Sequence, residues 1–168
     1  MCYRVTLNME VYMTTTSSIY HNQKIRGFNH VSTKFIGDTN YTRIERKEHS
    51  CTACGSREVN IQHARDRQVR GQNVGSSRLV LEVAVHRIHC PKCKSLSCEN
   101  LDSLPHPKSR ITRSLARAIL ELRREMSLSA IAKYCGLDWD TVKNLEKDWL
   151  TRKYRRIRMS DVRIIGIN

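Results

Sequence analysis

Apolar and polar residues alternate along the first half of the chain, and this period predicts strands. The longest alternating run predicts a strand over residues 78–89, with four apolar side chains on one face: Leu79, Leu81, Val83 and Val85. A β-hairpin is predicted over residues 31–47, because residues 37–40, Gly-Asp-Thr-Asn, favour a turn between two alternating runs. A shorter strand is predicted over residues 58–63. It is followed by a predicted basic loop with glycines at its bends: Arg65, Arg67, Arg70, Gly71 and Gly75.

The second half of the chain changes to helical spacing. Residues 101–109 contain Pro105 and Pro107 and are predicted to be a linker. After them, Thr112 can cap a helix that runs to about residue 126, with one apolar stripe: Leu115, Ile119, Leu122 and Met126. The predicted fold class is therefore α+β, with a small β module followed by an all-α domain.

Residues 127–147 have the spacing of a helix-turn-helix. Ala132 is small enough for a second helix to cross over it, and Gly136 permits the left-handed backbone of a tight turn. Asp138 is a suitable N-cap for the next helix, on which Val142 would point back into the same core. The alternative is a helical hairpin that only packs against a neighbour. The basic character of the chain favours DNA binding.

That basic character is strong. The chain has 30 Lys and Arg residues against 16 Asp and Glu residues, a net charge of +14 and a pI near 9.9. Such a field suits a polyanion, either nucleic acid or an anionic membrane. No apolar run approaches the ~20 residues of a membrane span, and the N-terminus lacks the pattern of a signal peptide. We therefore expect a cytoplasmic, nucleoid-associated protein with double-stranded DNA as its partner and no membrane.

Two Cys-x-x-Cys motifs, Cys51–Cys54 and Cys90–Cys93, stand on either side of the predicted strands. Tetrahedral zinc takes four thiolates, and a two-residue spacer lets one tight turn aim two sulfurs at one metal. We expect a structural zinc ion that cross-links these distant motifs, in the layout of a zinc ribbon. The alternative is four free or disulfide-bonded cysteines.

Other possible zinc ligands are expected to play no part in this site. Cys98 is interpreted as a spare thiol. His63, His86 and His89 are expected to be packed or solvated, because four thiolates already complete the coordination shell.

Candidate DNA contacts fall into two groups. Four residues of the second helix of the helix-turn-helix are predicted to reach the groove of DNA: Trp139, Lys143, Asn144 and Lys147. A basic run that follows is predicted to hold phosphates, although a charge run can also be a solvated face: Arg152, Lys153, Arg155, Arg156 and Arg158. Asp138 and Asp140 are assigned to capping and to the helix dipole.

The order of these parts resembles the N-terminal half of ISL-three-type insertion-sequence transposases, over roughly residues 19–168. The resemblance rests on five stretches: Ile25-Arg-Gly-Phe28, Cys51-Thr-Ala-Cys54-Gly55, Val85-His-Arg-Ile-His-Cys-Pro-Lys-Cys93, Arg110-Ile-Thr-Arg113 and Gly136-Leu-Asp-Trp-Asp-Thr-Val-Lys143. It implies a zinc-finger module, a helix-turn-helix and then a DDE catalytic domain. It also implies sequence-specific DNA binding at terminal inverted repeats, with self-association or a full-length transposase as further partners.

The resemblance also implies where catalysis would begin. Residues 162–167 read as a buried strand like the family's entry strand, which ends in the first catalytic carboxylate, but Asn168 stands at that position. DDE chemistry needs several carboxylates to hold two metal ions. We therefore expect a truncated transposase that is not an enzyme.

The expected domain organisation follows from these parts: a disordered lead-in (1–18), a β-hairpin and zinc-ribbon domain (19–100), a linker (101–109), a helix-turn-helix domain (110–150), and a basic segment that starts a truncated catalytic strand (151–168). Two other functional classes stay open. One is a zinc-ribbon/helix-turn-helix transcriptional regulator, and the other is an RNA-binding or protein-bridging zinc ribbon.

Overall fold

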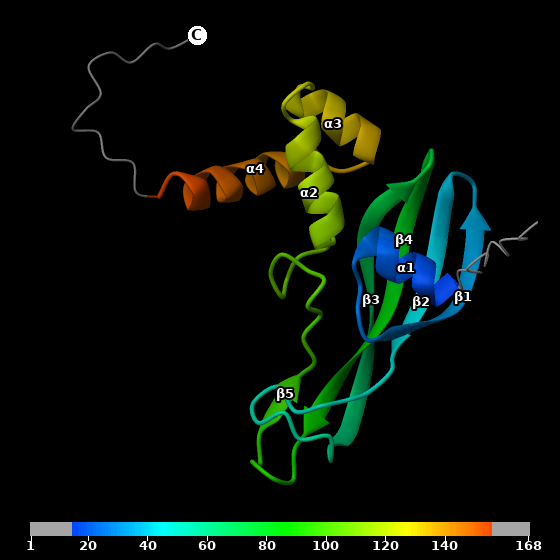
Figure 1. Cartoon of the computed structure of the whole chain (residues 1–168), viewed down its shortest axis with the longest axis vertical. Coiled ribbons are helices and arrows are strands. Elements are labelled where there is room, and N and C mark those ends of the chain that lie inside the picture. The colour runs from blue at the N-terminus through cyan, green and yellow to red at the C-terminus, as the bar shows by residue number, and fades with distance from the viewer. Residues whose placement is uncertain (1–14, 156–168) are drawn as a thin grey trace, which may run out of the picture. The chain divides into compact units, whose positions relative to one another are not determined.

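The computed structural model describes residues 15–155, a mixed sheet followed by helices (Figure 1). The elements, in chain order, are α1 (Thr15–Gln23), β1 (Phe28–Ile36), β2 (Thr39–Arg46), β3 (Asn60–Val74), β4 (Ser77–His89), β5 (Leu96–Cys98), α2 (Arg113–Leu122), α3 (Leu128–Cys135) and α4 (Trp139–Lys153). This order confirms the predicted α+β class. Residues 15–18, expected in a disordered lead-in, belong to helix α1.

The sheet has the strand order β1-β2-β4-β3, and β5 also pairs with β4. Strands β1 and β2 form the predicted hairpin, and β3 and β4 form a second antiparallel hairpin. Strands β2 and β4 run parallel along the first half of β4, whereas β5 pairs with its last three residues, 87–89. Strand β4 is therefore the central strand. It connects the hydrophobic half of the sheet to the end that carries the cysteine motifs.

The structure shows that the interpretation of residues 64–74 as a loop was wrong. The predicted basic loop is a continuation of β3, whose ladder with β4 pairs Arg65 with Val85 and Arg67 with Val83. The alternation of charged and polar residues concealed this strand because β3 lies at the edge of the sheet, where much of it is exposed. Gly71 lies inside the strand, and a Cβ there would come within 2.9 Å of Gln23 Oε1 and Leu79 Cδ2.

The hydrophobic core lies on one face of this sheet. Its buried members come from the α1–β1 connection and the start of β1, from strands β2, β3 and β4, and from the segment before α2: Ile25, Phe28, Ile44, Val69, Leu79, Leu81, Val83 and Leu104. The β4 face predicted from its alternation is therefore confirmed over residues 79–83. Leu104 belongs to residues 101–109, which were expected to be a linker. Because Leu104 is buried in the core of the sheet, this segment packs against the sheet as well as connecting it to the helices.

Contacts divide the chain into two compact units, residues 1–117 and 118–168, with the division inside α2. Thr112 caps this helix as predicted, since its Oγ1 accepts a hydrogen bond from the Leu115 N–H (3.2 Å). The helix ends at Leu122 rather than near Met126. The N–H groups of Arg124 and Glu125 bond the carbonyls three residues back, a tighter turn that ends the α-helix. No helix in the described part of the chain is long and apolar enough to cross a membrane.

Candidate metal centre and DNA-binding helices

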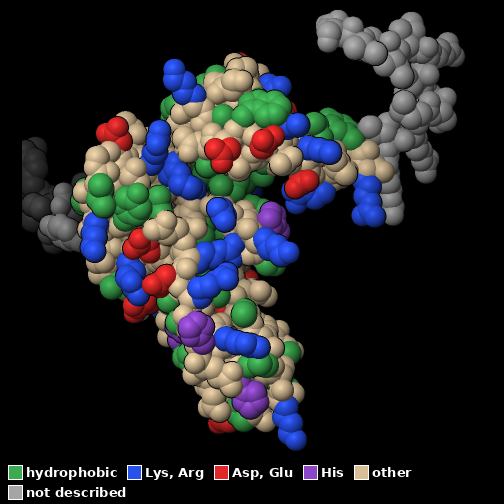
Figure 2. All heavy atoms as spheres, turned by 180° about the vertical axis from the view of Figure 1, so that it is seen from behind, with side chains coloured by type: hydrophobic (Ala, Val, Ile, Leu, Met, Phe, Trp, Pro, Cys, Tyr) green, Lys and Arg blue, Asp and Glu red, His purple; other side chains and the backbone are tan. Residues whose placement is uncertain are grey.

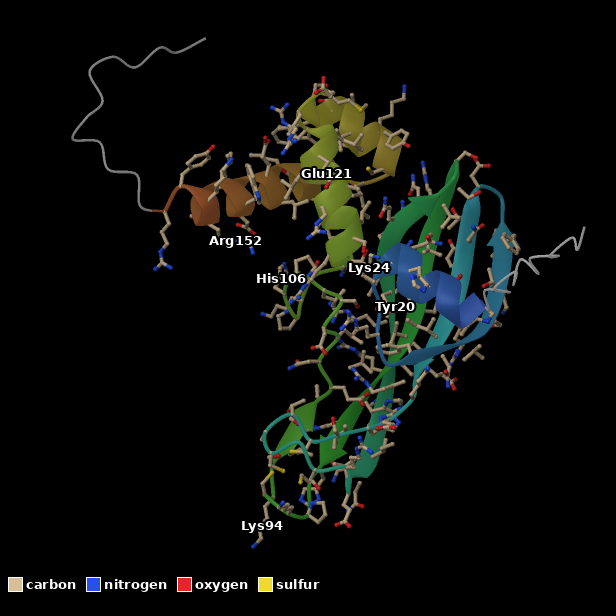
Figure 3. The ribbon with its side chains drawn as sticks, in the orientation of Figure 1. Tyr20, Lys24, Lys94, His106, Glu121 and Arg152 are labelled. Atoms are coloured by element: carbon tan, nitrogen blue, oxygen red, sulfur yellow. The ribbon has the colours of Figure 1, made fainter. Side chains whose placement is uncertain are left out.

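The two Cys-x-x-Cys motifs fold into the same kind of turn. In the first, the Cys51 N–H donates to the Ser56 carbonyl (2.8 Å), and in the second, the Cys90 N–H donates to the Ser95 carbonyl (3.0 Å). Each turn therefore spans six residues, from its first cysteine to the serine whose carbonyl accepts the hydrogen bond. Figure 3 shows the sulfur atoms of these cysteines near the labelled Lys94.

Each turn requires a left-handed residue after its second cysteine. Gly55 has φ 72° in the first turn, and Lys94 has φ 55° in the second. Glycine adopts this backbone freely, whereas lysine does so at a cost of roughly 1–2 kcal/mol. The second turn keeps this conformation with a lysine, so the surrounding hydrogen bonds and the sheet must hold it. The Ala53 N–H also points back at the Cys51 sulfur (3.4 Å).

The structure brings the four predicted cysteines together as a possible metal site. Their sulfurs lie within 4.8 Å of one another, with 3.5 Å between the sulfurs of Cys51 and Cys93 and 3.6 Å between those of Cys54 and Cys90. These separations are far above the ~2.05 Å of a disulfide bond, and the four are free thiols. Cys51 and Cys90 are buried, and Cys54 and Cys93 are exposed.

The thiols in this cluster share hydrogen bonds unequally. The Ser95 hydroxyl, followed by the backbone N–H groups of Cys54 and Ala53, lowers the pKa of Cys51 to about 6. The Ser56 N–H favours the Cys54 thiolate, but the Cys93 thiol, burial and the other two thiols oppose it and raise the pKa of Cys54 to about 11. Four thiolates at this separation repel one another, so a bound divalent cation is what would allow all four to ionise together.

Three residues that were predicted not to bind zinc lie outside the cysteine cluster: Cys98, His63 and His89. Cys98 is exposed. His86 belongs to a second group that the sequence reasoning missed, together with His49 and Glu99; the ligand atoms of the three lie within 4.8 Å of one another. No sequence signal links them, because His49 and Glu99 are separated by 50 positions.

This second group has the ligand types of a metal site, but its bonding is that of a structural ion cluster. A carboxylate accepts only, so the Nδ1–H groups of His49 (2.7 Å) and His86 (2.9 Å) each donate to one Glu99 oxygen. Arg46 Nε lies 3.2 Å from Glu99 Oε1, an electrostatic contact without hydrogen-bond alignment, and supplies the cation. The cluster joins the segment before the first cysteine turn to β4 and to the residue after β5.

The same contacts decide the charge of Glu99. Burial raises the pKa of Glu99, but the hydrogen bonds from His49 and His86, together with the Arg46 charge, outweigh burial and lower it below its ordinary value. Because the folded pKa is lowered, the carboxylate stabilises the fold above the unfolded pKa, about 4.3. This contribution is lost as the pH falls through the lower, folded pKa.

Glu99→Gln is expected to reduce the free energy of unfolding by about 2 kcal/mol or more at pH 7, because it leaves Arg46 without its buried counter-charge. Urea unfolding followed by circular dichroism measures this. The control is Glu48→Gln, which removes an exposed carboxylate 3.4 Å from Arg57 and should cost at most about 1 kcal/mol. If the two substitutions reduced the free energy of unfolding equally, Glu99 would not be the buried counter-charge of Arg46. The same conclusion would follow if the loss caused by Glu99→Gln stayed unchanged below about pH 4.

Helices α3 and α4 form the predicted helix-turn-helix. Gly136 is left-handed (φ 61°, ψ 45°), and the following Leu137 N–H donates to the Ala132 carbonyl (2.9 Å), which closes the end of α3. Ala132 and Val142, which were expected to meet in the core, are both buried, and Ile131 and Cys135 of α3 are buried with them.

Asp138 is the N-cap of α4, as predicted, but its side chain makes no capping hydrogen bond. Its carbonyl accepts from the N–H groups of Thr141 (3.0 Å) and Val142 (3.3 Å). Ser127, which the sequence reasoning overlooked, caps α3 by accepting from the Ala130 N–H (3.3 Å). Asp138 thus acts through its backbone and, with Asp140, through the charge it places at the positive end of α4.

The predicted groove-reading residues lie on one exposed face of α4. Trp139, Lys143 and Lys147 follow each other at intervals of one helical turn, and Asn144 is beside them; all four are exposed. The Lys143 Nζ lies 4.7 Å from the centre of the Trp139 ring, a cation–π contact that orients both side chains. Asn144 and Lys147 lie on the side of α4 away from buried Val142, whereas Trp139 lies three residues before it, at the border of the buried side.

Three of the five residues predicted to contact phosphates, Arg152, Lys153 and Arg155, lie within the described part of the chain. Arg152 and Lys153 lie in the last turn of α4, which extends to residue 153, and Figure 3 labels Arg152. The Lys153 Nζ lies 4.6 Å from the Trp149 ring centre and 5.0 Å from that of Tyr154, so this cation packs on aromatic faces. Arg155 is exposed. The remaining two, Arg156 and Arg158, lie outside the described residues, as does the predicted strand at 162–167.

Comparison with known proteins confirms the resemblance. Residues 106–150 match the family model described as the helix-turn-helix domain of transposase family ISL3. Over 128 residues the chain is 29% identical to the transposase for insertion sequence element IS1001 from Bordetella parapertussis. This alignment covers 76% of the chain and 31% of the relative, so the chain spans about a third of that protein's length. No solved structure matches the chain. The chain therefore carries a transposase-like helix-turn-helix DNA-binding region.

Proposed function

We propose that this chain, with its ISL3-family helix-turn-helix at residues 106–150, binds duplex DNA sequence-specifically at the terminal inverted repeats of a transposable element. The observation that carries the proposal is the exposed face of α4. It follows a left-handed corner at Gly136 and exposes Trp139, Lys143 and Asn144, while Val142 of the same helix is buried in the core. In helix-turn-helix proteins, the corresponding second helix lies in the major groove.

The residues on this face suit different tasks. Asn144 can bond adenine at two positions, and Lys143 can donate to guanine, so both could distinguish bases. Arg152 and Arg155 are cations on or after the last turn of α4 and are suited to phosphate contact, which is independent of base identity. In this proposal, zinc is held by Cys51, Cys54, Cys90 and Cys93 and has a structural role, since four cysteines leave no open coordination position.

We also propose that the chain binds DNA without cutting it. Among residues 15–155, the groups of three or more candidate metal ligands are the cysteine cluster and the His49–His86–Glu99 group. The first has no carboxylate, and the second has one carboxylate already in contact with Arg46. Neither supplies the paired oxygen ligands that two catalytic metal ions require at a phosphate.

Lys143→Ala and Asn144→Ala are expected to weaken binding to the terminal repeat by about 1–3 kcal/mol more than binding to random duplex. Arg155→Ala should weaken both by similar amounts and reduce the salt dependence. Fluorescence anisotropy with labelled duplexes at several salt concentrations measures both effects. The wild-type protein should leave the labelled strands intact when Mg²⁺ or Mn²⁺ is added.

The pattern of losses identifies the alternatives. Equal losses on the two duplexes for all three variants would show that α4 does not read bases. Tight binding to a promoter but not to the repeats would indicate a regulator, and preference for single-stranded RNA would indicate the RNA-binding alternative. Strand cleavage that persists through further purification would contradict the proposal of binding alone.

A further inference from the structure

We infer that the sheet unit carries a second DNA-binding surface, separate from the helix-turn-helix: a basic groove along the edge strand β3 that takes the phosphodiester backbone of duplex DNA. The inference rests on the proposed function, because it assumes that the chain's polyanionic partner is duplex DNA. The groove has a volume of about 1070 Å³ and is formed by residues of β2, β3, β4 and the segment 107–110. All of these residues belong to one compact unit.

The segment before α2 builds one wall of this groove. The Arg70 N–H donates to the Arg110 carbonyl (2.8 Å), and the Thr112 N–H donates to the Arg70 carbonyl (2.9 Å), so this segment lies along the edge of β3. The guanidinium group of Arg67 donates to the carbonyls of Pro107 and Ser109, both at 2.6 Å. The cations of this segment are therefore fixed beside those of the strand.

The groove concentrates positive charge that nearby acids do not neutralise. Its two carboxylates are engaged already: Asp66 lies 3.8 Å from Arg43, and Glu82 accepts from Gln68 (3.1 Å). Three further lining cations are exposed and have no ion-pair partner within the described part of the chain: Arg65, Lys108 and Arg110. Figure 2 shows Lys and Arg side chains gathered in the middle of the face that it presents.

The surroundings of Arg67 disfavour its charged form. Desolvation, followed by the charges of Arg65 and Arg110, lowers the pKa of Arg67. Bringing these cations together with too few acids to neutralise them is unfavourable in the free protein, and a bound polyanion would relieve it. Arginine also presents a planar fork of donors that matches the oxygens of a phosphate.

The lining of the groove favours the backbone of a duplex over single-stranded nucleic acid. Proteins that bind single strands stack bases on aromatic side chains. No aromatic residue is among those described as lining this groove. A groove that contacts phosphates and no bases suits a duplex, because the bases of a duplex stay stacked inside it. A second contact on the same DNA molecule would also raise affinity, because it acts at high effective concentration once α4 has bound.

The test uses the full-length chain and compares two triple variants that remove equal charge. The groove triple is Arg65→Gln, Lys108→Gln and Arg110→Gln. The control triple replaces three exposed cations of the same unit that do not line the groove, Arg78→Gln, Arg87→Gln and Lys34→Gln. Arg67 is left in place because it bonds the segment 107–110 to β3. Affinity is measured on duplexes of about one and about three helical turns, roughly 10 and 30 base pairs.

Each phosphate contact contributes roughly 0.9 to the slope of log affinity against log salt concentration. On the longer duplex, we expect the groove triple to reduce this slope by about 2 and to lower affinity at least tenfold, with a much smaller loss for the control triple. The groove triple should lose the gain in affinity on lengthening the duplex, whereas Lys143→Ala should keep it. If the two triple variants lost affinity equally, the groove would not be a DNA-binding surface. A loss of affinity seen only with single-stranded RNA would also contradict the inference.

These outcomes separate this inference from the proposed function. The helix-turn-helix proposal fails if Lys143→Ala and Asn144→Ala do not discriminate between repeat and random duplex. The groove inference is judged on random duplex as well, where base reading by α4 plays no part. A groove triple that binds random duplex as the control triple does would therefore contradict the groove alone.

Discussion

Removal of zinc is expected to unfold one half of the sheet and leave the other half folded. The two cysteine turns are 42 positions apart at Cys51 and Cys93, and the metal would be their main connection. The neighbouring part of β4 has little core of its own, since Ile88 and Cys90 are its buried apolar residues between positions 86 and 93. The other half of β4 contributes Leu79, Leu81 and Val83 to the hydrophobic core.

Hydrogen exchange of the backbone amides measures this difference along a single strand. After treatment with a strong chelator, or in Cys90→Ser, amides of residues 86–98 should lose protection by several orders of magnitude, because a structural zinc site contributes on the order of 10 kcal/mol. Amides of residues 79–83 should keep most of theirs. Metal analysis should give about one equivalent of zinc in the wild type and none in Cys90→Ser.

Cys98→Ser is the matched control. Cys98 is exposed, lies outside the cluster and belongs to the neighbouring strand β5, so its replacement should change neither zinc content nor exchange. A wild-type protein with less than half an equivalent of zinc, or amides 86–98 that keep their protection after chelation, would contradict the zinc proposal.

Sequence reasoning predicted the parts of this protein that depend on short-range patterns. The Cys-x-x-Cys spacing forces each pair of sulfurs into one turn, so the cluster could be anticipated before the strands between the motifs were known. The helix-turn-helix could be anticipated for the same reason. Gly136 supplies the left-handed corner within a few residues of the apolar positions that the corner brings together.

The parts that were missed depend on pairing between distant residues. Residues 64–74 read as a loop because Arg65, Asp66, Arg67 and Gln68 are all charged or polar, but the ladder to β4 fixes them as a strand. Strand propensity depends on this kind of context. The Glu99 cluster joins residues separated by 50 and 13 positions, and no local pattern records such a contact.

The same pairing explains why the basic groove could not be predicted. The sequence shows a basic stretch that contains Arg65, Arg67 and Arg70. It does not show that these residues lie beside Lys108 and Arg110. That position results from the bonds between Arg70 and the segment before α2. Residues 101–109 were expected to be a linker because of their prolines. Proline lacks an N–H donor, yet the carbonyl of Pro107 still accepts a hydrogen bond from Arg67.

Ile131→Ala is expected to unfold the helix-turn-helix and abolish specific DNA binding. Ile131 is 0% exposed and belongs to a small set of buried apolar residues in the described part of the second unit, residues 118–155: Ile119, Ile131, Ala132, Cys135 and Val142. Truncation of a fully buried isoleucine costs about 2–5 kcal/mol. A core of the size found in residues 118–155 supplies only a few kcal/mol of stability, and the expected loss is comparable to that amount.

The measurements are thermal unfolding by circular dichroism and affinity for the terminal repeat. Ile131→Val should give an intermediate result, since it costs about 1 kcal/mol and leaves most of the side chain. Leu150→Ala on α4 is the control, because Leu150 is 39% exposed and is not among the proposed DNA contacts. It should leave both helicity and affinity nearly unchanged. If Ile131→Ala instead binds the repeat as tightly as Leu150→Ala does, α3 is not the support that holds α4 in its DNA-binding position.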